Sequence, residues 1–261
     1  MKRARRKFFI FLLFVFLGLT AFYFFYLSPR YTVPILMYHR FGYEENNTLF
    51  VSPENFMRQM AYLKKRGYRV ISLEELVKGL KKGKRFKHKT VVITIDDGYK
   101  DNYIYAYPVL RKYHFPATIF LIADFIGKKE EFMNWKQVNT LVHSNIISIG
   151  GHTRVHSYLP EIKEKERLWE EISGCKRVIE ERINRKINYF CYPTGGFNEQ
   201  IKAMVRRAGY KGACTTNRGE GRDVYELRRI KITNSDMNKP FNFWAKLSGY
   251  YYLFRRKKAS E

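Results

Sequence analysis

The amino-acid sequence predicts an α/β protein in which short parallel strands alternate with helices around a barrel-like sheet. Short apolar segments rich in β-branched residues recur about seven times, and stretches with helical periodicity separate them. The 261 residues are 45% hydrophobic, which suffices for a sizeable core and excludes an intrinsically disordered chain.

The predicted strands are continuous apolar runs, as expected for a parallel sheet that is buried on both faces. Because parallel neighbours need a crossover connection, the alternation of strand and helix favours this sheet type. In chain order the predicted strands cover 33–39, 69–71, 90–95, 116–122, 146–152, 187–193, 211–216 and 227–232.

Local signals mark the ends of the predicted helices. Ser52 is an expected N-cap, Pro53 stands in the first turn, and Gly67 ends that helix. Ser72 is expected to cap the next helix. The remaining helices are predicted over 103–113, 135–143, 162–184 and 198–210.

An uncharged apolar segment of 20 residues, 8–27, follows a basic leader. As a helix it would be about 30 Å long, the thickness of the hydrocarbon core of a bilayer. The five basic residues before it favour a cytoplasmic N-terminus and place the rest of the chain outside the cytoplasm of a cell with an inner membrane. We therefore expect an uncleaved single-pass anchor, and a cleaved signal peptide is the competing interpretation.

The formal net charge of +25 is concentrated in the leader, in the segment 78–89 and in residues 255–258. No nucleic-acid-binding motif accompanies these clusters, so we expect no nucleic acid partner. Basic clusters also suit an anionic membrane or polymer, and a solvated face is the default interpretation. The aromatic and basic tail, 241–261, is predicted either to lie on the membrane surface or to close the barrel as a packed helix.

The three cysteines contain no CxxC pair and form no disulfide framework. We expect buried free thiols, with a bond between Cys191 and Cys214 as the alternative if their strands are neighbours.

Polar side chains follow several predicted strands, at the edge where α/β proteins collect their chemistry. His39 ends the first strand, Asp96 and Asp97 end the strand 90–95, and His152 ends the strand 146–152. Pro193 and Thr194 end a further strand. We expect these residues to lie together.

His152 and His156 are four residues apart, a spacing that would align both imidazoles on a helical turn. Thr153 stands where the zincin motif has its glutamate, which argues against that class. Two histidines and one aspartate form a facial ligand set for zinc, with iron, cobalt or nickel as alternatives. The second aspartate would be a general base for a water molecule.

The segments TIDDG (94–98), HTRVH (152–156) and YPTGG (192–196) together resemble the motifs of the polysaccharide deacetylases, the NodB-homology or carbohydrate esterase family 4 group. PILMYHRFG (34–42) resembles the opening strand of the poly-N-acetylglucosamine deacetylase branch. The resemblance implies a distorted (β/α)7-type barrel, a divalent metal ion, and hydrolysis of acetyl groups on N-acetylated sugars.

Carried over motif by motif, the resemblance implies a role for each matching residue. Asp96 would be the catalytic base, while Asp97, His152 and His156 would bind the metal. The backbone N–H of Thr194 would hold the oxyanion.

The sequence also departs from the family pattern. Cys191 stands where many members have an arginine, and Thr194 stands where an aromatic residue is usual. The segment 227–229 lacks the histidine of the last family motif, so His39 is the expected general acid.

We therefore expect a membrane-anchored de-N-acetylase with an anchor in 1–30, a catalytic domain in 31–240 and a tail in 241–261. Its expected partners are an N-acetylated glycan and membrane lipid. Trp135, Tyr192 and Pro193 are candidate substrate contacts, with core packing as the alternative for the two aromatic side chains. An O-acetyl esterase and a non-catalytic glycan-binding barrel are the alternatives.

Overall fold

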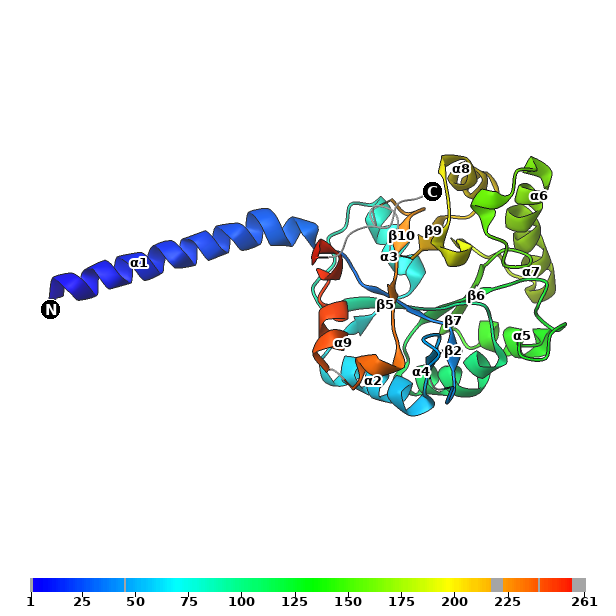
Figure 1. Cartoon of the computed structure of the whole chain (residues 1–261), viewed down its shortest axis with the longest axis horizontal. Coiled ribbons are helices and arrows are strands. Elements are labelled where there is room, and N and C mark those ends of the chain that lie inside the picture. The colour runs from blue at the N-terminus through cyan, green and yellow to red at the C-terminus, as the bar shows by residue number, and fades with distance from the viewer. Residues whose placement is uncertain (1, 45, 217–222, 239, 255–261) are drawn as a thin grey trace.

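The computed structural model describes residues 2–44, 46–216, 223–238 and 240–254, which form a parallel sheet wrapped by helices and one long helix that projects from it (Figure 1). The barrel strands run in the order β10-β9-β8-β7-β6-β5-β1-β11. They are β1 (Ile35–Tyr38), β5 (Thr90–Ile95), β6 (Ala117–Leu121), β7 (Ile147–Gly151), β8 (Tyr189–Cys191), β9 (Gly212–Thr215), β10 (Leu227–Arg228) and β11 (Ile230–Lys231).

The last predicted strand closes the barrel in two short pieces. β10 pairs in parallel with β9, and β11 pairs in parallel with β1. Arg229 separates the two pieces, so one continuous segment bridges the edges of the sheet. With β10 and β11 sharing one position, the ring has the form of the distorted (β/α)7-type barrel that the family resemblance implies.

Helices cover the outside of this sheet, and their ends follow the local signals in the sequence. The Ser52 and Ser72 side chains accept hydrogen bonds from the Asn55 and Glu75 amides, as N-caps do. The helices are α2 (Pro53–Lys65), α3 (Leu73–Lys81), α4 (Tyr107–Tyr113), α5 (Trp135–His143), α6 (Lys165–Trp169), α7 (Cys175–Ile183), α8 (Glu199–Arg207) and α9 (Pro240–Leu247).

Short elements complete the chain and account for one difference at a helix boundary. The helix predicted over 162–184 begins at Lys165, because Leu159–Glu161 forms a separate 3-10 turn and Ile162 is extended. The short elements are η1 (Phe22–Leu27), η2 (Ser28–Arg30), β2 (Arg40–Phe41), β3 (Phe50–Val51), β4 (Arg69–Val70), η3 (Asn102–Ala106), η4 (Leu159–Glu161), η5 (Glu170–Gly174), η6 (Pro193–Gly195), η7 (Asn234–Asp236) and η8 (Tyr251–Phe254).

The described part of the tail packs on the barrel. Phe243 and Leu247 of α9 are buried, and the Phe243 ring lies 5.5 Å from that of Tyr62 on α2. Phe241 and Trp244 are exposed. The basic tail residues 255–258 lie outside the described part of the chain. The cysteines are buried free thiols, although Cys191 and Cys214 are register partners on β8 and β9.

The apolar N-terminal segment forms α1 (Lys2–Ala21), which continues through η1 and projects away from the barrel (Figure 1). In the described chain, one helix, Arg5–Arg30, is long and apolar enough to cross a membrane. None of its most apolar window is buried against the protein.

Candidate active site

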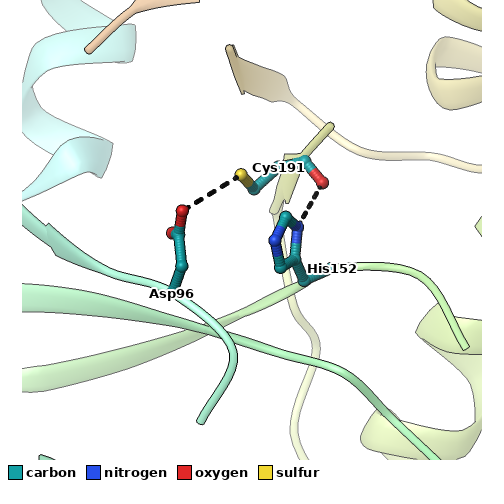
Figure 2. Close-up of side chains that lie close together, drawn as sticks. All are labelled: Asp96, His152 and Cys191. Carbon is teal, nitrogen blue, oxygen red and sulfur yellow. Dashed lines mark hydrogen bonds between the residues drawn. The ribbon is translucent and has the colours of Figure 1, made fainter. Parts of the chain in front are cut away.

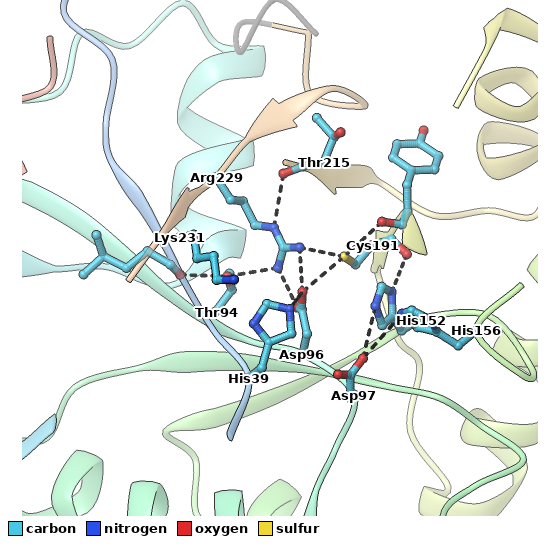
Figure 3. Close-up of polar contacts among 12 residues, drawn as sticks. His39, Thr94, Asp96, Asp97, His152, His156, Cys191, Thr215, Arg229 and Lys231 are labelled. Carbon is cyan, nitrogen blue, oxygen red and sulfur yellow. Dashed lines mark hydrogen bonds and ion pairs between the residues drawn. The ribbon is translucent and has the colours of Figure 1, made fainter. Parts of the chain in front are cut away.

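The strand ends bring the predicted residues together at the carboxyl edge of the barrel (Figure 3). His39 follows β1, Asp96 and Asp97 follow β5, His152 follows β7, and Cys191 ends β8. His39 Nε2 lies 3.7 Å from Asp96 Oδ2, and His152 Nε2 lies 3.4 Å from Asp97 Oδ1. Because the strands are parallel neighbours, residues far apart in the chain meet at one edge.

The two adjacent carboxylates point to different partners because the backbone turns just after β5. β5 ends at Ile95, before both aspartates. Asp97 has a φ of 72° and Gly98 a φ of 83°, so the backbone turns sharply at these residues. This left-handed turn aims Asp97 at the histidines, while Asp96 faces Arg229 (Figure 3).

Gly98 gives a test of this turn, because an added Cβ would lie 2.6 Å from Leu121 Cδ2. Gly67 is a matched control: it has a φ of 69° and an added Cβ would meet nothing within 4 Å. We expect Gly67→Ala to lower the free energy of unfolding by about 1–2 kcal/mol, the cost of the left-handed backbone. Gly98→Ala should cost about 1–3 kcal/mol more and displace Asp97. Equal losses in denaturant unfolding of the full chain would contradict this account.

Asp97, His152 and His156 form a set whose ligand atoms all lie within 4.8 Å of one another. Asp97 Oδ1 is buried and has no hydrogen-bond partner. His152 Nδ1 lies 2.8 Å from the Cys191 carbonyl oxygen, so Nδ1 carries the proton and Nε2 keeps its lone pair toward Asp97. The orphaned oxygen and the two imidazole nitrogens therefore fit a divalent cation.

The electrostatics of this set also call for a positive charge. Burial, followed by the neighbouring Asp96 charge, raises the pKa of Asp97 to about 7. Burial lowers the pKa of His152 to about 3 and also lowers that of His156. A cation would favour the ionised carboxylate and the neutral imidazoles that metal binding requires.

A second triplet, Asp96, His152 and Cys191, is also close together (Figure 2). Its Asp96 carboxylate is already held by the Arg229 guanidinium, and burial raises the pKa of the Cys191 thiol well above its ordinary value. A cation there would face a fixed positive charge and a protonated thiol, so this triplet suits a metal less well.

The loop that carries the two histidines is not helical, contrary to the expectation from their spacing. Thr153 has a φ of 64° and His156 a φ of 63°, and the His156 N–H donates to Thr153 Oγ1 at 2.9 Å. The Glu171 carboxylate accepts hydrogen bonds from the Arg154 and Val155 amides. This buried glutamate fixes the loop so that the imidazole rings lie 4.9 Å apart. No motif in the sequence marks Glu171, which lies within the helix predicted over 162–184.

Arg229 is a second site residue that was not predicted from the sequence. Its Nη1 lies 2.5 Å from Asp96 Oδ1, its Nη2 lies 2.7 Å from Asp96 Oδ2, and Nη2 also lies 3.0 Å from Cys191 Sγ (Figure 3). The Arg229 guanidinium thus lies beside Cys191, the residue that stands where many family members have an arginine. Its signal in the sequence is the two-residue period of the strand, which turns Arg229 to the same side as Leu227.

Arg229 decides the charge state of Asp96. Burial alone would raise the pKa of Asp96, but the charge and hydrogen bonds of Arg229 outweigh it and hold that pKa well below its usual range. Burial lowers the pKa of His39 to about 4. At neutral pH the structure therefore presents an ionised Asp96 beside a neutral His39.

The remaining predicted residues are placed differently. Thr194 is exposed on η6 with a φ of 51°, and the Gly195 and Gly196 amides donate within that turn. Tyr192 is fully buried, stacks on Phe197 and donates to the Tyr225 carbonyl, so the expected contact with a sugar ring is wrong for this side chain.

Pro193, the residue before the exposed Thr194, is also buried. Trp135 packs beside Gly127 and 5.9 Å from the Arg182 guanidinium. These contacts lie on the helical layer and do not join Trp135 to the Asp–His cluster.

A parallel barrel that carries the Asp97, His152 and His156 cluster beside a separate buried Asp96 is an arrangement that suits a (β/α)-barrel hydrolase. Comparison with known families agrees, since residues 83–213 match the polysaccharide deacetylase family model. A Bacillus subtilis (strain 168) protein that bears the name polysaccharide deacetylase YxkH is 33% identical over 204 residues, which are 77% of this chain and 71% of that protein. The chain therefore belongs to the polysaccharide deacetylase family and is an enzyme of that class.

Two further relatives are similar over most of the chain. The poly-beta-1,6-N-acetyl-D-glucosamine N-deacetylase of Staphylococcus epidermidis is 26% identical over 217 residues, 78% of this chain and 75% of that protein. The structure of the Streptococcus pyogenes deacetylase PplD in complex with acetate superposes with a TM-score of 0.75 at 28% identity, covering 82% of this chain and 97% of that one.

Proposed function

We propose that this deacetylase removes N-acetyl groups from an N-acetylglucosamine-containing glycan, and that it does so as a metal-dependent enzyme anchored in the membrane. The observation that carries the proposal is the orphaned, buried Asp97 Oδ1 between His152 and His156, beside an Asp96 held ionised by Arg229. The name of the Staphylococcus epidermidis relative supports the N-acetylglucosamine substrate class.

Asp97, His152 and His156 would hold the cation, and zinc is the first candidate because two histidines and one carboxylate leave positions open. When bound, such a cation supplies Lewis-acid polarisation of an acyl oxygen and lowers the pKa of a water molecule. Cobalt, nickel and iron accept the same ligand set.

Asp96 accepts the proton of the attacking water, since it is ionised at neutral pH and lies in the cluster. His39 is neutral at neutral pH and its Nε2 lies 3.7 Å from Asp96 Oδ2, so it can take up the proton that Asp96 has accepted and pass that proton on to the leaving sugar amine. The Thr194 amide, on an exposed turn, is the proposed oxyanion donor and would lower the barrier by about 3 kcal/mol.

The anchor is the proposed role of the helix Arg5–Arg30. Its apolar side chains are exposed along its length, which is costly in water and favourable in lipid. The basic leader favours a cytoplasmic N-terminus, so the barrel would lie on the outer side of the inner membrane.

An acetate-release assay with the full chain in detergent tests this proposal. We expect acetate from N-acetylglucosamine oligomers but not from acetylated xylan, loss of activity with a chelator, and recovery with zinc. A His152→Ala/His156→Ala variant should lose both bound metal and activity. Release of acetate from xylan alone would identify an O-acetyl esterase. No release of acetate from any glycan would favour a non-catalytic, glycan-binding barrel. Unchanged metal content in the double variant would refute the ligand set.

A further inference from the structure

A cavity of about 550 Å³ lies at the opposite end of the barrel from the Asp–His cluster. Ile35 at the start of β1 and Leu227 at the start of β10 line it, which places it at the amino ends of the strands. Leu80 of α3, the linker residue Ser28 and Tyr251 of the tail form other walls. The proposed reaction does not use this cavity.

The charge of the cavity selects an anion. Lys84, Arg85 and Arg228 line it together with His88, and its described lining contains no acidic residue. The lining basic loop belongs to the segment 78–89, which has seven basic residues and no acid. The nearest acid to Lys84 is Glu75, whose carboxylate lies 3.7 Å from Lys84 Nζ outside the lining, so the cations remain in excess.

The projecting helix indicates where this cavity lies relative to the bilayer. Tyr23, which belongs to the apolar helix, lines the cavity and its hydroxyl lies 3.1 Å from His88 Nε2. Because the uncharged segment 8–27 matches a hydrocarbon core of about 30 Å, Ser28 marks the beginning of the headgroup region. The cavity is lined by both Tyr23 and Ser28, so it lies at the boundary between the hydrocarbon and headgroup regions.

The linker fastens the helix to the barrel at this point (Figure 1). The Tyr31 hydroxyl donates to the Lys87 carbonyl, and the Thr32 amide donates to the Gly249 carbonyl. An added Cβ at Gly249 would lie 2.2 Å from the Tyr31 ring, so the packing is close. These contacts hold the basic loop beside the helix.

We propose that this cavity binds the phosphate headgroup of an anionic phospholipid and holds the amino ends of the strands against the bilayer. The proposal rests on the anchoring part of the proposed function. In this orientation the Asp–His cluster, at the carboxyl ends of the strands, faces away from the lipid and lies about one strand length, roughly 15–20 Å, from the cavity. A glycan chain outside the membrane then suits the cluster better than a sugar at headgroup depth.

Native mass spectrometry of the full chain, released from micelles that contain equal amounts of dioctanoyl-phosphatidylglycerol and dioctanoyl-phosphatidylcholine, tests the site. We expect one retained phosphatidylglycerol in preference to phosphatidylcholine. Lys84→Ala/Arg85→Ala should weaken this preference by about 10- to 30-fold. Lys64→Ala/Lys65→Ala removes the same charge from exposed positions at the end of α2, outside the cavity. This control variant should keep the preference for phosphatidylglycerol.

Equal retention of the two lipids would overturn the proposal, and so would an equal effect of the two double variants. Displacement of phosphatidylglycerol by an equal concentration of glycerol phosphate would assign the cavity to a soluble phosphate compound instead. Acetate release in detergent should be unchanged in Lys84→Ala/Arg85→Ala, which shows that the variant is folded. This separates a failure of the lipid site from a failure of the proposed deacetylation.

Discussion

Replacing Asp96 with asparagine is expected to lower the rate of acetate release by about 10²- to 10⁴-fold, because the amide cannot take a proton from the attacking water. The bound metal should remain at one equivalent, since Asp97, His152 and His156 are untouched. The measurement is the initial rate at saturating glycan, together with the metal content of the purified protein.

Asp236→Asn is the matched control for this variant. Asp236 is also buried and paired with a cation, the Lys246 ammonium at 2.7 Å, but it lies in η7 outside the cluster. Loss of its charge tests whether removing any buried, paired carboxylate impairs activity through the fold. If Asp96→Asn keeps more than a tenth of the rate, or if both variants lose activity equally, Asp96 is not the base.

Replacing Arg229 with methionine should produce the largest loss of stability, because it leaves the Asp96 carboxylate buried without its cation. Breaking such a pair lowers the free energy of unfolding by about 3–5 kcal/mol. The loss depends on pH. In the wild-type chain the depressed pKa of Asp96 contributes stability above the unfolded value near 4, and this is lost as the pH falls through the folded value.

In Arg229→Met the shift in the pKa of Asp96 changes direction, since burial without the guanidinium raises this pKa above its ordinary value. Protonation then relieves the buried charge, so the difference in stability from wild type should be largest near neutral pH and shrink in acid. The acid limb of kcat/KM should move to higher pH, because the base must be ionised. Denaturant unfolding and rate profiles across pH measure both effects.

Two further variants isolate the pair. Arg228→Met removes the same charge one position earlier, from a side chain 4.6 Å above the Tyr252 ring, and should cost about 1 kcal/mol. Asp96→Asn/Arg229→Met should be more stable than Arg229→Met alone, since it leaves no buried charge at either position. Equal unfolding midpoints for the two arginine variants would contradict the importance of this ion pair.

Much of the fold followed from local patterns in the chain. The helix Trp135–His143 and the N-caps Ser52 and Ser72 have the predicted positions, because capping and helical periodicity depend on neighbouring residues. The strand ends indicated where His39, the two aspartates and His152 would meet, since parallel strands share one carboxyl edge.

The errors arose where a side chain depends on distant partners. The spacing of His152 and His156 suggested a helical turn, but Glu171 from a later helix holds an irregular loop. Tyr192 was expected at the substrate, yet packing against Phe197 places it in the core.

The sequence alone predicts the order of the strands and helices and the apolar segment 8–27, because periodicity and caps are local properties. The resemblance of its motifs to a family indicates which residues gather at the carboxyl edge of the sheet. The partner of Asp96 required the tertiary structure. Arg229 is 133 residues away in the chain, and it reaches Asp96 because the split last strand closes the barrel between β9 and β1. That closure puts the Arg229 guanidinium beside Cys191, the position at which many members of the family have an arginine.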